Sequence, residues 1–211
     1  MLWQQLAKAV PLYKKTTNND KGYLETINNP EPKQIVWFLN HWGIMRRHFD
    51  VGKISKCIID SKNLLEKFSN YRIETAELMP LKDDIQDVFQ RFLKATGSPV
   101  AASKVLHVLV PQFFVMWDNA IRAGYGCGIG NRWVAETTNE TYYIFLIRVQ
   151  NKLRKAVQSY IGSRSIKNLG EASNALKKEL YTNGRKTLAK IIDEYNFMKF
   201  TKGTEELWVE S

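Results

Sequence analysis

The sequence has few cysteines and no long uninterrupted apolar run, and each scarcity excludes a class of protein. Its two cysteines, Cys57 and Cys127, lie far apart with no metal-ligand spacing around them. This excludes a disulfide scaffold and gives no indication of a zinc module. The most apolar stretch, residues 98–117, is interrupted by a lysine, a histidine and a proline. It therefore does not predict a membrane-spanning helix, and we expect no membrane partner.

An apolar leader segment is also missing, because residues 1–10 carry Gln4, Gln5 and Lys8. We therefore expect a cytoplasmic protein, nucleoid-associated if it binds DNA, with its thiols reduced. The chain has no convincing alternation of period two, no repeat and no low-complexity tract. No motif for a cofactor or a metal is complete, so we expect neither.

What is present predicts one compact all-α unit. The chain has 211 residues, of which 44% are hydrophobic and 12% aromatic, enough for a single globular core. Apolar positions recur every three to four residues, which predicts about eight to ten helices. Two helical lobes are possible within this unit, one of residues 1–80 with the C-terminal helices and one of residues 81–165.

The expected elements follow from this periodicity and from the turn residues between them. A polar loop is expected over residues 16–32 and an extended tail over 201–211. The expected helices cover residues 2–13 (ending near Pro11), 33–48, 50–68, 81–95, 98–110, a short segment after 118, 141–161, 169–181 and 187–197.

Basic charge is concentrated in the second half of the chain. The net charge is +10, and residues 148–190 hold eleven lysines and arginines against only Glu171 and Glu179, a local net charge of +9. On the helix of residues 141–161, Arg148, Lys152 and Lys155 form one stripe beside an apolar one. This pattern indicates a polyanion partner, DNA or possibly RNA. A solvated basic face and an anionic membrane surface are the alternatives.

The most distinctive segment is a glycine turn between two helices, followed by a lone carboxylate. Gly97 is suited to the left-handed position that closes a helix, Ser98 to an N-cap and Pro99 to the next first turn. The second helix carries one permanent charge, Lys104, and the apolar run 113–117 then leads directly into Asp118.

This order resembles the helix-hairpin-helix DNA glycosylase superfamily over roughly residues 80–125. The resemblance implies a base-excising enzyme in which Asp118 is the catalytic carboxylate and hairpin amides near Gly97 and Ser98 bind a phosphate. Arg122 stands where the family often has a basic residue. Where bifunctional members carry a lysine nucleophile this chain has Ala101, and Lys104 lies one turn further along. The chain also has one hairpin glycine where the family usually has two.

The chemistry of base release gives these residue types a physical role. Breaking an N-glycosidic bond builds positive charge on the sugar, which the Asp118 carboxylate would stabilise. Apolar neighbours would lower the pKa of Lys104, so that its amine could attack the sugar. The extruded base would stack on an aromatic ring, for which the candidates are Trp117, Trp133, Tyr125 and Tyr142.

Each of these residues also has a purely structural interpretation. Asp118 can cap its own short helix or pair with Arg122, Lys104 can reach solvent along its stem, and His107 and Trp117 can be core residues. The glycine-rich segment 122–132 can be a phosphate cradle or a surface loop. A non-catalytic nucleic-acid-binding module, or a domain whose basic face meets an acidic protein, therefore remain alternatives to the enzyme.

Overall fold

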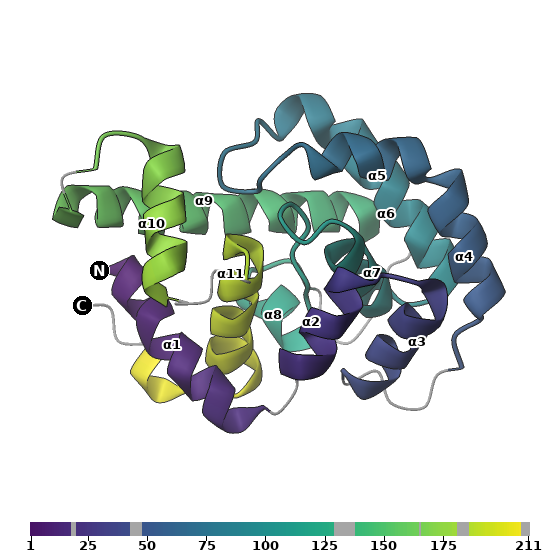
Figure 1. Ribbon diagram of the computed structural model, residues 1–211, viewed down its shortest axis with the longest axis horizontal. Helices are drawn as coiled ribbons and strands as arrows, with labels where there is room; N and C mark the ends of the chain where they lie inside the picture. The colour runs from purple at the N-terminus through teal and green to yellow at the C-terminus, as the bar shows by residue number, and fades with distance from the viewer. Residues whose placement is uncertain (18–19, 43–47, 129–137, 165, 181–185, 208–211) are drawn as a thin grey trace.

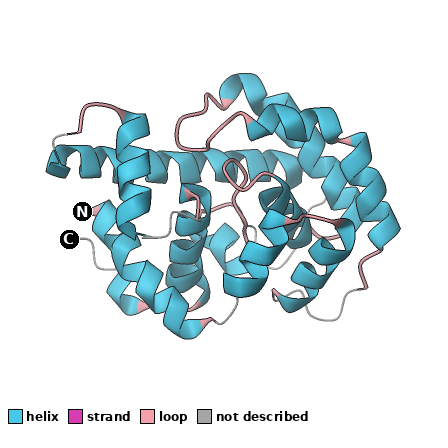
Figure 2. Ribbon diagram, in the orientation of Figure 1, coloured by secondary structure: helices cyan, strands magenta, loops and turns pink. Residues whose placement is uncertain are grey.

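The computed structural model describes residues 1–17, 20–42, 48–128, 138–164, 166–180 and 186–207, and every regular element among them is helical (Figure 2). The all-α prediction is confirmed, with eleven α-helices in this part of the chain. In chain order the elements are α1 (Leu2–Thr16), α2 (Asp20–Asn28), α3 (Pro32–His41), α4 (Val51–Asp60), α5 (Lys62–Ser69), η1 (Met79–Leu81), α6 (Lys82–Thr96), α7 (Pro99–Leu109), α8 (Asn119–Gly124), α9 (Thr138–Arg164), α10 (Leu169–Leu180), α11 (Leu188–Asn196), η3 (Phe197–Thr201) and η4 (Glu205–Leu207).

The long helix α9 is the axis of the molecule (Figure 1). Its 27 residues span about 40 Å at 1.5 Å per residue. One end carries α1, α10 and α11, and α6 packs against it toward the other end, with α4 and α7 on α6. The predicted apolar stripe of α9 is buried, because Leu146, Val149, Leu153 and Val157 are all 0% exposed.

The packing groups the N-terminal helices differently from the two lobes considered above. Helix α1 lies against α11, α9 and α10, whereas α3 and α4 pack on each other and onto α7 and α6. Residues 1–80 are therefore shared between the two ends of α9. A single hydrophobic cluster runs through both ends.

Several elements differ from the predictions. The helix expected over residues 33–48 ends at His41, and the expected extended tail contains the helical turn η4. Pro11 lies inside α1, on its exposed side, so its ring needs no room in the core. The expected loop of residues 16–32 contains α2, whose Tyr23 is fully buried against His107. Tertiary burial therefore overrides a local composition that is poor in helix formers. The expected helix of residues 50–68 is two helices that meet at Ser61, with φ −106° and ψ 6°.

The predicted turn between α6 and α7 is confirmed. Gly97 closes α6 in the left-handed conformation, at φ +61°. The Ser98 hydroxyl oxygen accepts a 3.4 Å bond from the Ala101 amide, and Pro99 is the first residue of α7. The apolar run that follows is anchored back on this turn, because the indole N–H of Trp117 donates to the Pro99 carbonyl at 3.0 Å.

Candidate functional site

Lys104 and Asp118 line the same cavity, although the chain between them turns through a buried loop. This space, here called the Lys104 cavity, has a volume of about 580 Å³. Its polar lining residues are Lys104, Asp118, Asp193, Thr201, Thr17, Asn40 and His41. Its apolar wall includes Tyr13, Trp42, Val100, Met116, Trp117 and Phe197.

Lys104 is held at this wall by the backbone of α3's C-terminal end. Its ammonium group donates to the carbonyl of Trp42. Burial lowers the pKa of Lys104 to about 8, and the opposing attraction of Asp193 and Asp118 only partly offsets the loss of hydration. A substantial neutral fraction near neutral pH follows, as a nucleophilic amine requires.

Asp118 has the structural role that the sequence left open. Its Oδ1 accepts a 2.8 Å bond from the Ile121 amide, so it caps α8. Its Oδ2 accepts from the Thr201 hydroxyl at 2.6 Å, which ties α8 to η3. A carboxylate has about four acceptor positions, so these two bonds leave capacity for a ligand.

Asp193 is a cavity residue that the sequence analysis missed. It lies on α11, is 5% exposed, and accepts a 2.8 Å bond from the ammonium of Lys190. Lys190 is itself fully buried, with its Nζ 4.7 Å from the ring centres of both Tyr13 and Trp42. Burial raises the pKa of Asp193 and the two neighbouring lysines oppose it. The spacing of Lys190, Asp193 and Glu194, three and four residues apart, was the available signal.

Most of the expected stacking rings are packing residues. Trp117 is 1% exposed and Tyr142 is 0% exposed, so neither presents a face to a base. Tyr125 is half-buried and donates from its hydroxyl to Asn196 Oδ1 at 2.8 Å. Trp133 lies outside the described residues. Half-buried Trp42, which is not among the expected stacking rings, is the tryptophan that lines the cavity with part of its surface exposed.

The hairpin amides are already bonded within the protein. The Gly97 N–H donates to the Leu93 carbonyl at 2.8 Å, and the Ser98 N–H donates to the Thr96 hydroxyl at 3.4 Å. The Ser98 hydroxyl is occupied as the cap of α7. The expectation that Gly97 and Ser98 offer amides to a phosphate is therefore not met, because the helix-ending geometry uses both donors.

The predicted basic stripe does face a concave site, but a different one. Arg148, Lys152 and Lys155 of α9 line a groove of about 420 Å³ with Tyr125 and with Lys199 of η3. We call it the α9 groove. Arg122, by contrast, lies over the Trp117 ring at 5.0 Å and donates to the Cys127 carbonyl at 3.4 Å.

The Lys104 cavity and the α9 groove lie on opposite sides of the C-terminal helix. Asp193 faces the cavity and Tyr195 faces the groove, and two residues along an α-helix are rotated by about 200°. In η3, likewise, Thr201 lines the cavity and Lys199 lines the groove. The basic stripe and the carboxylate–amine pair are thus not parts of one cleft.

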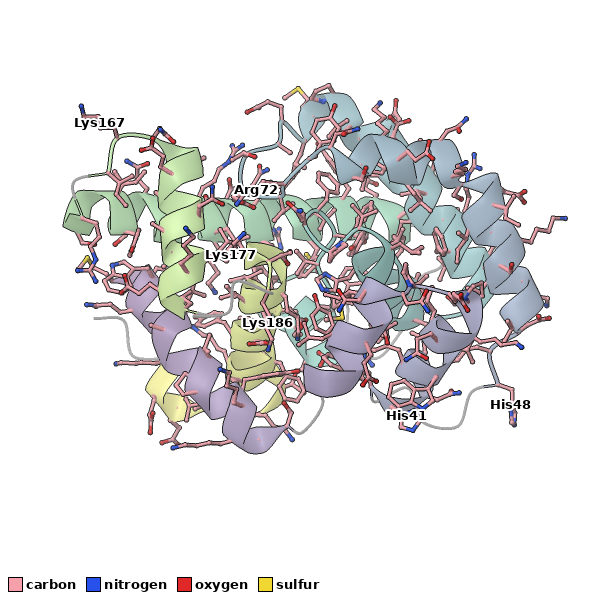
Figure 3. All side chains as sticks on the ribbon, viewed as in Figure 1. His41, His48, Arg72, Lys167, Lys177 and Lys186 are labelled. Carbon is pink, nitrogen blue, oxygen red and sulfur yellow. The ribbon has the colours of Figure 1, made fainter. Side chains whose placement is uncertain are left out.

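Two of the lysines counted in the basic segment of residues 148–190 are buried in the protein. Lys186 and Lys190 are 3% and 0% exposed and pair with Glu194 and Asp193, which lie just past the counted segment. Figure 3 shows the contrast between Lys186 in the interior and Lys167 at the edge of the molecule. The charge count of 148–190 therefore overstates the positive surface.

Comparison of the chain with family models, with curated protein sequences and with solved structures found no match to any of them. Within the described part of the chain, no helix has the length and apolarity needed to cross a membrane. The same residues contain no cluster of three or more histidine, cysteine or acidic side chains placed to hold a metal ion.

Proposed function

We propose that this protein is a DNA N-glycosylase that releases a damaged base at the Lys104 cavity. The observation that carries the proposal is the meeting of Lys104 and Asp118 in one largely apolar cavity, beside a helix–turn–helix closed by Gly97. The lowered pKa of Lys104, about 8, supports its role as an amine nucleophile.

The reaction assigns a separate task to each group. The neutral amine of Lys104 attacks C1′ of the sugar, the bond from C1′ to the base nitrogen breaks, and the base leaves with the bonding electrons and takes one proton from the new ammonium. The C1′–O4′ bond then opens, O4′ takes the second proton, and an imine joins Lys104 to C1′. The carboxylate of Asp118 stabilises the positive charge that develops on the sugar. Asp193, on the wall of the same cavity, is already paired with Lys190, so this task falls to Asp118.

The dimensions and the rim of the cavity suit an extruded nucleotide. Its volume of about 580 Å³ falls within the roughly 300–1,000 Å³ of small-molecule sites. Two cations lie over aromatic rings that line the cavity. Arg122 Cζ is 5.0 Å from the ring centre of Trp117, and Lys202 Nζ is 5.4 Å from that of Phe197. Lys202 is exposed and is suited to bind a phosphate that flanks the extruded nucleotide, whereas Arg122 is held by the Cys127 carbonyl.

Borohydride trapping tests the proposal. The protein is incubated with duplexes that carry individual base lesions or an abasic site, and sodium borohydride is added to reduce any imine. We expect a covalent adduct with the wild type, none with Lys104→Met, and a wild-type yield with the matched control Lys178→Ala, at an exposed position outside the cavity and the α9 groove. Absence of both base release and adduct across the panel would remove the enzymatic function.

A second candidate, a non-catalytic nucleic-acid-binding module, is favoured by one specific observation. The predicted phosphate-binding residues Arg148, Lys152 and Lys155 line the α9 groove, which lies across α11 from the cavity. This candidate predicts binding that weakens steeply with salt and no product on any lesion. The same panel, assayed for binding and for release, separates the two.

A further inference from the structure

A groove between the packed helices α4 and α6 carries lysines that have no carboxylate partner. We call it the α4–α6 groove, and its volume is about 350 Å³. Its basic wall residues are Lys53 and Lys56 of α4 and Arg91 and Lys94 of α6. Arg91 is held by the Asp87 carboxylate at 2.8 Å and by the Asp60 carbonyl at 2.9 Å. Within the described part of the chain, no carboxylate pairs with any of the three lysines. Three cations in one groove can therefore bind an external anion.

The composition of this wall does not suit a nucleic-acid strand. The wall includes Asp60, which lies seven residues after Lys53 and therefore about 10 Å further along α4. A strand carries a negative charge at every nucleotide, so one of its phosphates would lie near this carboxylate and be repelled. Among the described residues of the wall there is also no aromatic ring on which a base could stack.

Apolar groups lie beside the lysines of the groove. Cys57 and Ala95 are part of its wall. Ile59 follows Lys56 by one turn on the same side of α4, and it is 69% exposed. A single exposed isoleucine is ordinary on a protein surface. Next to lysines without partners, however, it provides an apolar contact for a ligand that also carries spaced negative charges.

We propose that the α4–α6 groove docks an acidic peptide segment of a partner protein. Carboxylates of the segment pair with Lys53, Lys56 and Lys94, and an apolar side chain of the segment packs on Ile59. Complementary charge of this kind speeds association and selects the partner. The small size of the groove indicates a transient complex, with an affinity in about the micromolar range. No residue of this groove lines the Lys104 cavity, so the docking does not depend on base release.

Fluorescence anisotropy with a labelled synthetic peptide tests the docking site on the full chain. The probe has about twelve residues, with leucines on one side of a helix and glutamates on the other. The groove variants are Lys53→Ala with Lys56→Ala, and Ile59→Ser, all at exposed positions. The matched control is Lys167→Ala with Lys178→Ala. It removes the same charge from exposed positions near α10, at the opposite end of the molecule from α4 (Figure 1).

We expect the double lysine variant to bind the peptide about tenfold more weakly, because two charge pairs are lost. Ile59→Ser should bind it about fivefold more weakly, because the contact with leucine is lost. The control variant should stay within about twofold of the wild type, and a peptide with glutamine in place of glutamate should not bind. Equal losses in the groove and control variants, or no binding by the wild type, would overturn the proposal.

A nucleic-acid strand as the true ligand gives a different pattern. An unlabelled oligothymidylate with the same number of charges should displace the peptide less effectively than the unlabelled peptide does. Equal displacement, or peptide binding that Ile59→Ser leaves unchanged, means that charge alone is recognised and rejects the peptide. The Lys104→Met variant should bind the peptide like the wild type, so a failure of the glycosylase proposal leaves this result unaffected.

Discussion

The Lys104 cavity and the α9 groove use the same kind of residue for opposite purposes. In the cavity, Lys104 is surrounded by apolar side chains, and burial lowers its pKa to about 8. In the groove, Lys152 rests on aromatic rings beside other cations. The first environment favours a neutral, reactive amine, whereas the second favours the charged form of the lysine. The side chains that surround a lysine therefore decide which chemistry it supports.

A third environment lies between them. Lys190 is fully buried on α11, and its charge is balanced by Asp193 at 2.8 Å and by Glu194 at 3.5 Å. The attraction of Asp193, Tyr13 and Glu194 holds the pKa of Lys190 well above its usual value, against the effect of burial. This lysine is neither a nucleophile nor an anion site. It holds α11, the helix that separates the cavity from the groove.

The largest effect expected is on stability, from removing this buried cation. Lys190→Ala leaves Asp193 buried without its partner, whereas Glu194 keeps Lys186, and we expect a loss of about 3–5 kcal/mol in the free energy of unfolding. Lys155→Ala in the groove should change it by less than about 0.5 kcal/mol. Chemical denaturation of both variants measures the difference, and similar losses would contradict the contrast between the two regions.

The pH dependence of amine labelling sharpens the comparison of Lys104 with an ordinary lysine. With a pKa of about 8, Lys104 has a neutral fraction at pH 7 about 230-fold larger than an ordinary lysine with a pKa near 10.4. Reductive methylation followed by peptide mapping should give a midpoint near pH 8 for Lys104 in the folded protein and a far higher one for Lys104 in the denatured protein. A midpoint for Lys104 above pH 10 would remove it as a nucleophile.

The lowered pKa of Lys104 also makes the free energy of unfolding depend on pH. Between pH 8 and its ordinary pKa, Lys104 binds more protons in the unfolded chain than in the folded one. The free energy of unfolding should therefore rise with pH across that window. Lys104→Met should abolish this contribution, which unfolding measurements at pH 8 and pH 10 would register.

The hydrogen bonds of His107, on the inner side of α7, hold this buried histidine in its neutral form. His107 Nδ1 lies 2.6 Å from the Phe114 carbonyl and therefore carries the proton, so Nε2 accepts from the Tyr23 hydroxyl at 2.9 Å. Tyr23→Phe leaves that nitrogen buried without a donor, and we expect a loss of about 1–3 kcal/mol.

His107 also predicts the response to acid. Burial lowers its pKa to about 3, so between pH 6.5 and 3 only the unfolded chain takes up the proton. Its contribution to stability is therefore lost as the pH falls through that window. A stability profile that is flat from pH 6.5 to 4 would contradict the neutral, buried state of His107.

The smallest expected change in stability comes from substitutions of Asp118, which separate its role as a helix cap from its role in base release. Asp118→Ala removes the cap of α8 and should cost about 1 kcal/mol, whereas Asp118→Asn keeps a capping oxygen and should cost less than about 0.5 kcal/mol. If the carboxylate also stabilises charge on the sugar, Asp118→Asn abolishes base release at nearly unchanged stability. Unchanged release would leave Asp118 as a cap only.

The local signals of the sequence were sufficient for the turn and for the main helices. Gly97, Ser98 and Pro99 specify the end of one helix and the start of the next through backbone preferences that act within a few residues. The apolar stripe of α9 was read correctly for the same reason. Helix α2 was missed because its stability comes from the burial of Tyr23 against His107, 84 positions away.

The candidate site shows the same limit. Lys104 and Asp118 were identified because the apolar segment around them made each charge conspicuous. Asp193 and Trp42 were not, since they lie 75 residues after Asp118 and 62 residues before Lys104, and only folding brings them to the cavity wall. The charge count of 148–190 likewise missed that Lys186 and Lys190 pair with carboxylates just past its end.

Composition, periodicity and turn chemistry by themselves determined that this chain is all-α, where its hairpin lies and which side chains are chemically unusual, because those properties depend on neighbours a few residues apart. The tertiary structure alone decided that Asp118 caps its helix, that Lys104 meets Asp193, and that the basic stripe faces away from both. Which side of α11 a residue faces depends on the packing of helices that are distant in sequence, and no local preference encodes it.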